Sequence, residues 1–186
     1  MIRTGDLKIS VFEFIVMIIV LYNQIMYIPQ SSKYKSVVVE LSASLSFMIF
    51  CNGVLSCING TEFFGSYYIN YVFTVIYFIL NGLVPLLWFK YMYIFYDTSP
   101  KKSTSYITTI PYLLYLLLIF INCFTDLFFY IDSNNRYQRG DGFWLIVVLS
   151  VIYIIASLVV IVLAITRNRG FRSEGKHILS GMLLVA

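Results

Sequence analysis

Five apolar runs, each long enough to cross a lipid bilayer, limit what this chain can fold into more than any other feature of its sequence. A spanning helix needs about 18 or more mostly apolar residues, because it rises about 1.5 Å per residue through hydrocarbon about 30 Å thick. The runs cover residues 7–28, 36–59, 67–96, 103–123 and 142–166. The sequence therefore predicts an all-α, polytopic transmembrane helix bundle with five full spans.

A sixth apolar run begins at the end of the chain. The last ten residues, HILSGMLLVA, rise only about 15 Å as a helix, half of the hydrocarbon thickness. We therefore expect residues 1–186 to form a single transmembrane domain that is cut within its sixth helix. The polar connections between the runs are short, so neighbouring helices are expected to pack antiparallel in one bundle.

The composition excludes several classes of protein. Hydrophobic residues make up 60% of the 186 positions and charged residues 12%, whereas a soluble globular domain has about 25% charged residues. The net charge of +4 does not indicate a nucleic-acid-binding protein, because the basic residues form short clusters between apolar runs. Cys51, Cys57 and Cys123 lie in or at the ends of these runs without a CxxC pair, which predicts reduced packing cysteines. With His177 as the only histidine, we expect no metal, no cofactor and no catalytic residues.

The basic residues predict the orientation of the bundle. Eight of them lie in one set of alternate loops and four in the other. The eight are Lys33, Lys35, Lys101, Lys102, Arg167, Arg169, Arg172 and Lys176, and the four are Arg3, Lys8, Arg136 and Arg139. Cytoplasmic loops carry the excess of Lys and Arg. We therefore expect a multi-pass protein of the cell (plasma) membrane with its N-terminus outside.

The loop at residues 124–141 belongs to the outer side and lies in the stretch LFFYIDSNNRYQRGDGFW. Its two arms, FFYID and RYQRG, flank a Ser-Asn-Asn segment whose side chains favour turns. This pattern predicts a short extracellular β-hairpin. In the first arm we expect Phe128 and Tyr130 on one face, and Phe129 and Ile131 on the other.

Two interpretations of the hairpin stay open. It can seal the outer end of the helices as a lid, because a lone hairpin is marginally stable and must bury its rings. It can also bind a small-molecule or peptide ligand through Tyr130, Asp132, Arg136 and Arg139, with Asp126 and Asp141 nearby. Gly140 and Gly142 would let the chain re-enter the membrane after the second arm.

Asn52 and Asn81 are the most central polar residues of the apolar runs. Amides in hydrocarbon usually hydrogen-bond to a neighbouring helix and hold it in place, at roughly 0.6–2 kcal/mol each. A ligand or ion site is the alternative. Convergence of both amides on one aqueous cavity would favour transport, whereas separate packing contacts would favour a sensory bundle.

Pro85 predicts a kink in the third apolar run after Asn81. Glu13 and Glu40 lie within apolar runs but are close enough to helix ends for their carboxylates to reach the membrane interface.

The stretch NCFTDLFFYIDSNNRYQRG lies between an apolar helix and a second one beginning GFWLIVV. This pattern resembles the N-terminal membrane region of Clostridia-type membrane diguanylate cyclases. In that family the helices precede a cytoplasmic GGDEF output domain, and related seven-helix regions precede histidine kinases. The resemblance follows the helix order over most of the chain and is specific over about residues 122–144. The chain holds no GGDEF stretch and no kinase nucleotide-binding motif, so by itself it is not expected to be an enzyme.

Three functions follow as hypotheses. The resemblance implies a sensory region that couples an extracellular or intramembrane cue to a cytoplasmic output domain, first of all a diguanylate cyclase. Paired output domains would favour a homodimer. The alternative is a small transporter or channel, which requires polar residues from several helices to meet at mid-membrane. The third is a structural membrane protein, in which small residues such as those of SASLS at residues 42–46 permit close helix contacts. The lipid bilayer is the partner common to all three, and no nucleic-acid partner is expected.

Overall fold

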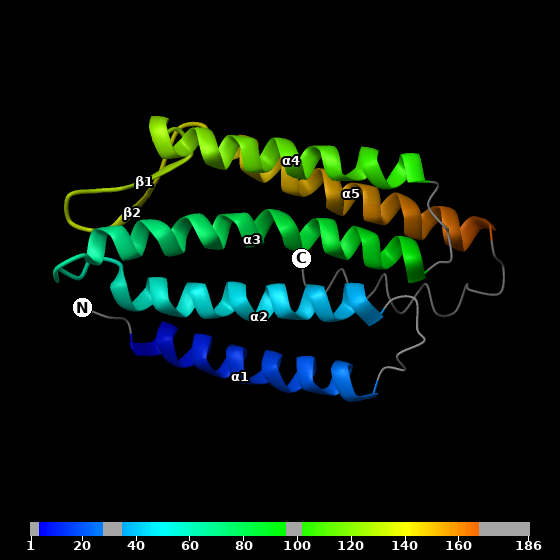
Figure 1. Cartoon of the computed structure of the whole chain (residues 1–186), viewed down its shortest axis with the longest axis horizontal. Coiled ribbons are helices and arrows are strands. Elements are labelled where there is room, and N and C mark those ends of the chain that lie inside the picture. The colour runs from blue at the N-terminus through cyan, green and yellow to red at the C-terminus, as the bar shows by residue number, and fades with distance from the viewer. Residues whose placement is uncertain (1–3, 28–34, 96–101, 168–186) are drawn as a thin grey trace.

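The computed structural model describes residues 4–27, 35–95 and 102–167. In chain order the elements are α1 (Thr4–Tyr27), α2 (Lys35–Ile58), α3 (Ser66–Phe95), α4 (Lys102–Thr125), β1 (Phe129–Ile131), β2 (Tyr137–Arg139) and α5 (Phe143–Arg167). The helices lie side by side and alternate in direction, with the hairpin and the α2–α3 loop at the same end (Figure 1). The predicted helix bundle with a small hairpin is therefore confirmed.

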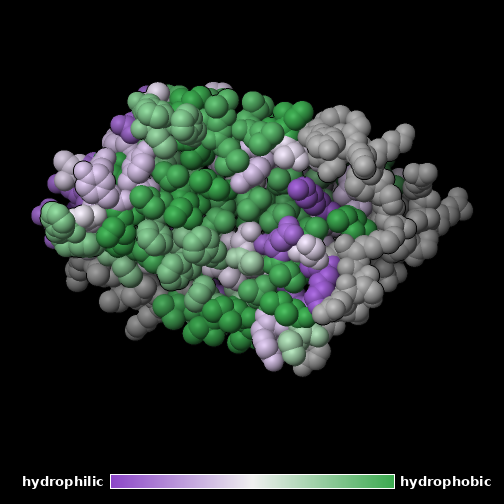
Figure 2. All heavy atoms as spheres, in the orientation of Figure 1, coloured by the Kyte–Doolittle hydropathy of each residue, from purple (hydrophilic) through white to green (hydrophobic). Residues whose placement is uncertain are grey.

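Four helices of the described chain are long and apolar enough to cross a membrane: Lys35–Ile58, Ser66–Phe95, Thr108–Thr125 and Phe143–Leu163. In α1 the described apolar part is Val11–Met26, which is shorter than these spans. The prediction of five full spans is thus supported for four. The predicted sixth run, from His177, lies outside the described residues. Figure 2 shows hydrophobic residues over most of the middle of the visible face, as expected of a lipid-facing surface.

The helix α3 is central to the bundle because it contacts α2, α4, α5 and the hairpin strand β1, while α2 also packs against α1. Small residues line the contact between α1 and α2. Ser42 and Ser46 of α2 are buried, and the Ser42 hydroxyl donates a hydrogen bond to Oε1 of Gln24 on α1. This polar contact between apolar helices agrees with the close approach expected of the SASLS segment.

Aromatic rings from the hairpin and from α3 form the core beneath the hairpin. The rings of Phe129 and Phe78 stack with centroids 4.7 Å apart and planes 12° apart. Phe129 and Ile131 are buried whereas Tyr130 is 39% exposed, which confirms the alternation predicted for these three. The prediction that Phe128 and Tyr130 face the same way is wrong, since Phe128 is fully buried and Tyr130 is not. Phe128 precedes β1, so the alternation of the strand does not govern its direction.

Glycine is required where the hairpin returns to the membrane. A Cβ atom on Gly140 would lie 2.2 Å from the carbonyl oxygen of Leu127. The Gly140 N–H donates to the carbonyl of Phe128 at 2.9 Å, and the Gly142 N–H donates to that of Leu127 at 2.9 Å. The two glycines therefore let the second arm close tightly against the first, and α5 starts at once after it.

The Tyr153 hydroxyl joins α5 to α4. It accepts a hydrogen bond from the backbone N–H of Tyr112 at 2.9 Å and donates one to the carbonyl of Thr108 at 2.7 Å. In an uninterrupted α-helix these two backbone groups, four residues apart, bond directly to each other. Pro111 precedes Tyr112 in α4. Helices kink at prolines and at points where a side chain is inserted between backbone groups. A hydroxyl of α5 thus takes part in the backbone bonding of α4.

Replacing Tyr153 with Phe should weaken this α4–α5 contact, because both backbone groups lose the hydroxyl. We expect Tyr153→Phe to lower the free energy of unfolding in mixed micelles by about 1–2 kcal/mol. Tyr22→Phe is the matched control, since Tyr22 is 59% exposed, and it should change stability by less than about 0.5 kcal/mol. Equal stability of the two variants would contradict this role of Tyr153.

Candidate functional site

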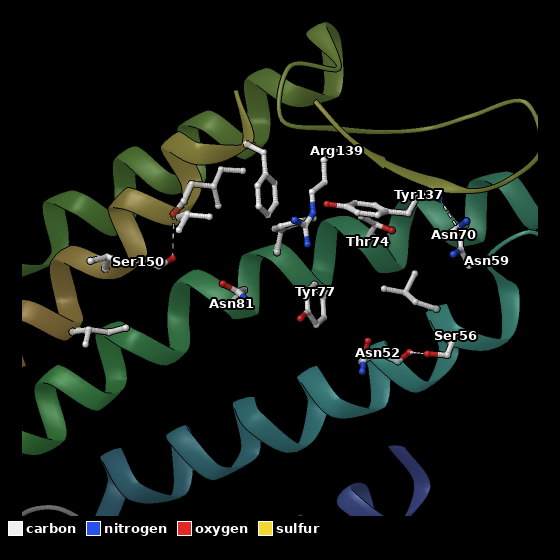
Figure 3. Close-up of a pocket in the computed structure, with 17 residues that line it drawn as sticks. Asn52, Ser56, Asn59, Asn70, Thr74, Tyr77, Asn81, Tyr137, Arg139 and Ser150 are labelled. Atoms are coloured by element: carbon white, nitrogen blue, oxygen red, sulfur yellow. Dashed lines mark hydrogen bonds between the residues drawn. The ribbon is translucent and has the colours of Figure 1, made fainter. Parts of the chain in front are cut away.

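A cavity of about 570 Å³ lies between α2, α3 and α5 beneath the hairpin (Figure 3). Its volume is within the range of about 300–1,000 Å³ that is typical of small-molecule sites. The polar lining consists of Asn52, Ser56, Asn59, Asn70, Thr74, Tyr77, Asn81, Tyr137, Arg139 and Ser150. The apolar lining consists of Leu55, Phe78, Phe143, Ile146, Val147, Val151 and Ile154. The cavity therefore combines hydrogen-bonding groups, mainly on α2 and α3, with an apolar wall on α5.

A polar stripe on α3 forms one side of this cavity. Asn70, Thr74, Tyr77 and Asn81 follow one another at intervals of three or four residues and all line the cavity. Residues at this spacing lie on one face of an α-helix. Polar side chains within an apolar span are expected to face the protein interior or a water-filled cavity, and this stripe does so.

Asn52 on α2 and Asn81 on α3, the two central amides of the sequence, both line the cavity. Within the described part of the chain, neither side-chain amide forms a hydrogen bond to another helix. The expected role of these two residues as contacts that hold helices together is therefore not observed. Pro85 lies one turn after Asn81 and supplies no N–H to its carbonyl. The two amides are instead free to bond to a molecule in the cavity.

Asn135 anchors the hairpin turn to the α2–α3 loop and to α3. Its Nδ2 donates hydrogen bonds to the carbonyls of Ile58 at 3.1 Å and Thr61 at 2.8 Å. Its own carbonyl accepts from the N–H of Gly60 at 2.7 Å and from Nδ2 of Asn70 at 3.0 Å. The backbone φ of 56° is one that Asn adopts more readily than most residues. One buried residue thus connects three segments of the chain.

Asn122, near the end of α4, fixes the beginning of the hairpin. Its Oδ1 accepts hydrogen bonds from the N–H groups of Phe128 at 2.7 Å and Phe129 at 3.2 Å, and its Nδ2 donates to the carbonyl of Phe129 at 2.9 Å. The side chain is fully buried. The amide of Asn122 therefore pairs with the backbone next to β1 as a neighbouring strand would.

Two buried polar atoms of the cavity lining have no hydrogen-bond partner in the described structure, namely Oδ1 of Asn70 and Oγ1 of Thr74. The two residues are 0% and 2% exposed. The orientation of the Asn70 amide is fixed, because its Nδ2 lies 3.0 Å from both the carbonyl oxygen and Oδ1 of Asn135, which can only accept. Leaving a buried polar atom unpaired costs about 1–3 kcal/mol, so a bound group that pairs with these atoms would be stabilised.

Arg139 brings a positive charge to the cavity at the end of β2. Its guanidinium carbon lies 4.8 Å from the centre of the Phe143 ring, and the group points from the hairpin toward α3 (Figure 3). Among the described residues, no carboxylate forms an ion pair with it. Burial raises the pKa of the neighbouring Tyr137 hydroxyl, which therefore stays neutral at pH 7 and can donate or accept a hydrogen bond.

The other three residues of the predicted ligand-binding set do not line the cavity. Tyr130 points away from the bundle, and Arg136 is exposed with its side chain near Gly60. Asp132 organises the turn, since its Oδ1 accepts the N–H groups of Asn134 and Arg136, each at 2.9 Å. The predicted set therefore divides, with Asn52, Asn81 and Arg139 together at the cavity and the hairpin's other polar groups on its surface.

Sequence reasoning missed Asn70, Thr74 and the anchoring role of Asn135. A signal for the first two was present, because Asn70 and Thr74 continue the face of Asn81 at helical spacing. Asn135 gave no comparable signal. The sequence indicates that Asn135 favours a turn. Its side-chain partners Ile58 and Thr61, however, lie more than seventy residues earlier in the chain, so local pattern does not identify them.

No protein-family model, curated protein or solved structure matches this chain. The resemblance of residues 122–144 to the membrane region of diguanylate cyclases therefore stays a prediction. In the described segments, no group of three or more His, Cys, Asp or Glu side chains could hold a metal ion. The three cysteines are free, as expected.

Replacing Asn135 with Gly should release the hairpin, because glycine keeps the positive φ but loses the side-chain bonds to the α2–α3 loop. We expect the backbone amides of β1 and β2 to exchange with deuterium about tenfold or more faster, as hydrogen bonds of roughly 1 kcal/mol each are lost. Mass spectrometry of the protein in micelles measures this exchange. Asn134→Gly, on the exposed neighbour, is the control, and equal exchange in the two variants would show that Asn135 does not anchor the hairpin.

The turn should also depend on the protonation of Asp132. Hydrogen bonds from the Arg136 N–H, from the Gln138 side chain and from the Asn134 N–H hold the pKa of this carboxyl below its usual value. A lowered pKa means that the stabilisation is present above about pH 4, the usual pKa of Asp, and is lost as the pH falls below it. Protection of the Asn134 and Arg136 amides, corrected for intrinsic exchange, should be constant from about pH 7 to 5 and then decrease. In Asp132→Asn this decrease should disappear; its persistence would assign it to another group.

Proposed function

We propose that this chain is the ligand-binding input region of a membrane signalling protein. The observation that carries the proposal is a polar cavity at the hairpin end of the bundle, beyond which α3 and α5 pack through apolar side chains. Unpaired amide and hydroxyl groups in a cavity of this volume are suited to bind a small molecule. Binding would change the arrangement of the helices only if the two arrangements bind the molecule unequally.

The route from the cavity to an output domain runs through α5. Strand β2 ends at Arg139, and α5 begins four residues later at Phe143, whose ring Arg139 contacts. The 25 residues of α5 extend over about 37 Å, enough to reach the opposite side of a bilayer. A ligand that displaces Arg139 would therefore act directly on the start of a helix that crosses the membrane.

The charge distribution and the sequence resemblance support the remaining parts of the proposal. The excess of basic residues favours a cytoplasmic location for the far end of α5 and an extracellular one for the hairpin, in a plasma membrane. The resemblance of residues 122–144 favours a diguanylate cyclase as the output, with a histidine kinase as the next choice. A paired output would make the signalling unit a homodimer.

A transporter is the second candidate, because convergence of Asn52 and Asn81 on one cavity is what a transport site requires. The half of the bundle beyond the cavity argues for a receptor instead. There, α3 and α5 pack through Leu86, Phe89 and Tyr153 and, further on, through Met92 and Ile161. Transport would require this apolar packing to open. A purely structural role leaves the unpaired atoms of Asn70 and Thr74 without an explanation.

A reporter of output tests the proposal. Residues 1–176, which end before the sixth apolar run, would be joined to a diguanylate cyclase catalytic domain, and the cyclic dinucleotide product would be measured in cells. Asn81→Leu removes a hydrogen-bonding group from the cavity and should change the output about fivefold or more, the range of ordinary allosteric coupling. Asn23→Leu makes the same change at an exposed amide of α1 and should leave the output unaltered.

Two outcomes would count against the sensory function. If Asn81→Leu and Asn23→Leu give the same output as the parent at equal protein levels, the cavity does not control a cytoplasmic domain. If vesicles that contain the chain take up a radiolabelled organic acid, and Asn81→Leu abolishes the uptake, the transporter becomes the better account.

A further inference from the structure

We infer that the cavity binds an amphipathic organic acid that carries a hydrogen-bond donor near its acidic group. This inference rests on the proposed function, since it names the ligand class of the same cavity. The anionic group would pair with Arg139, the donor with the unpaired atoms of α3, and the apolar tail with the wall that α5 provides.

The charge of the lining selects an anion. Arg139 is the one charged residue among the residues that line the cavity, and all other polar lining groups are amides, hydroxyls or phenols. Arg139 is exposed at the mouth of the cavity, and its guanidinium can offer two parallel N–H donors to a carboxylate or phosphate. The contact of Arg139 with Phe143 holds the group beside the cavity. A cationic ligand would meet an unpaired positive charge.

The unpaired atoms on α3 specify the second group of the ligand. Oδ1 of Asn70 can only accept a hydrogen bond, and Oγ1 of Thr74 can accept one as well. A carboxylate or phosphate has no hydrogen to give them when it is ionised. A hydroxyl or amino group close to the acid supplies this hydrogen, so the cavity should prefer a hydroxy or amino acid to a simple fatty acid.

The wall on α5 specifies the rest of the molecule. Ile146, Val151 and Ile154 line the cavity, and the last two are 40% and 48% exposed. An alkyl or aromatic tail laid against them would cover apolar surface next to the polar stripe of α3. The arrangement of charge, acceptors and apolar wall thus matches an amphiphile with a polar head.

The test uses the whole chain in nanodiscs of phosphatidylcholine and radiolabelled 3-hydroxydecanoate as the probe, with the uptake of empty nanodiscs subtracted. We expect Arg139→Gln to raise Kd about tenfold or more, because a charge-assisted pair is lost. Arg136→Gln removes the same charge from the same hairpin outside the cavity and should keep Kd within about twofold. Arg139→Lys keeps the positive charge and should restore part of the affinity, which separates a charge effect from misfolding.

Competition tests the chemistry of the head group. Unlabelled decyl phosphate should displace the probe, whereas decyltrimethylammonium should not. Decanoate should compete more weakly than 3-hydroxydecanoate, because it lacks the donor. Equal binding by the Arg139→Gln and Arg136→Gln variants, or equal competition by the cationic amphiphile, would overturn the inference. Equal competition by decanoate would overturn the assignment of a donor group.

The same acid could come from a free metabolite or from the head group of an anionic lipid. Nanodiscs that also contain phosphatidylglycerol distinguish these sources. Loss of probe binding there in the parent chain identifies a lipid head group, and unchanged binding identifies a free acid; both agree with the proposed chemistry. If probe binding depends on Arg139 but the cyclase reporter does not respond to Asn81→Leu, the ligand class stands and the sensory function fails. If the reporter responds to Asn81→Leu but probe binding does not depend on Arg139, the sensory function stands and the ligand class fails.

Discussion

The buried amides of Asn135 and Asn122 form the hydrogen bonds that hold the two ends of the hairpin against the helices, and Asn135 holds its turn. A two-stranded hairpin of three residues per strand is marginally stable in water, so its position has to come from contacts with other elements. The Asn135 side chain supplies such contacts by bonding to the carbonyls of Ile58, at the end of α2, and Thr61 in the α2–α3 loop. Its backbone carbonyl receives bonds from that loop and from Asn70. Together with the bond from the Tyr137 N–H to Oδ1 of Asn59, this anchor places Tyr137 and Arg139 at the cavity beside the polar stripe of α3. Because the Asn70 Nδ2 group donates to Asn135, the orientation of this amide is fixed, and its Oδ1 has no partner in the described structure.

The parts of this fold that depend on local pattern could be predicted from the sequence. Apolar run length placed α2 at residues 36–59 against the observed Lys35–Ile58, and the Ser-Asn-Asn segment placed the turn between β1 and β2. The hydrogen-bond partners of individual polar side chains could not be predicted, because these partners lie far along the chain. Asn52 and Asn81 were expected to hold helices together, but they line a cavity. Asn122 and Asn135 form the hydrogen bonds that attach the hairpin to the rest of the chain. Hydrophobic periodicity specifies which face is buried, but it does not specify which amide meets which carbonyl.

The candidate site has the features of a binding site placed at one end of a membrane bundle. Its polar groups come mainly from α2, α3 and β2, and its apolar wall comes from α5. In the described half of the bundle beyond it, α3 and α5 pack through apolar side chains. A molecule in this cavity would meet one charge and several neutral hydrogen-bonding groups. The short connection between Arg139 and α5 gives the site a direct mechanical link to a helix long enough to cross the bilayer. The proposed receptor function requires two properties together, a selective cavity and an element that responds to its occupancy.

The central claim is that occupancy of the cavity displaces α5, and a distance measurement tests it most directly. Spin labels at Leu163 on α5 and Met26 on α1, both exposed, report the separation of these helices at the end of the bundle away from the hairpin. Pulsed electron resonance would record the distance distribution in nanodiscs, with the native cysteines replaced, before and after addition of 3-hydroxydecanoate. The account predicts a shifted distribution in the parent chain and an unshifted one in Arg139→Gln. An identical distribution with and without the acid, at concentrations that saturate binding, would contradict it.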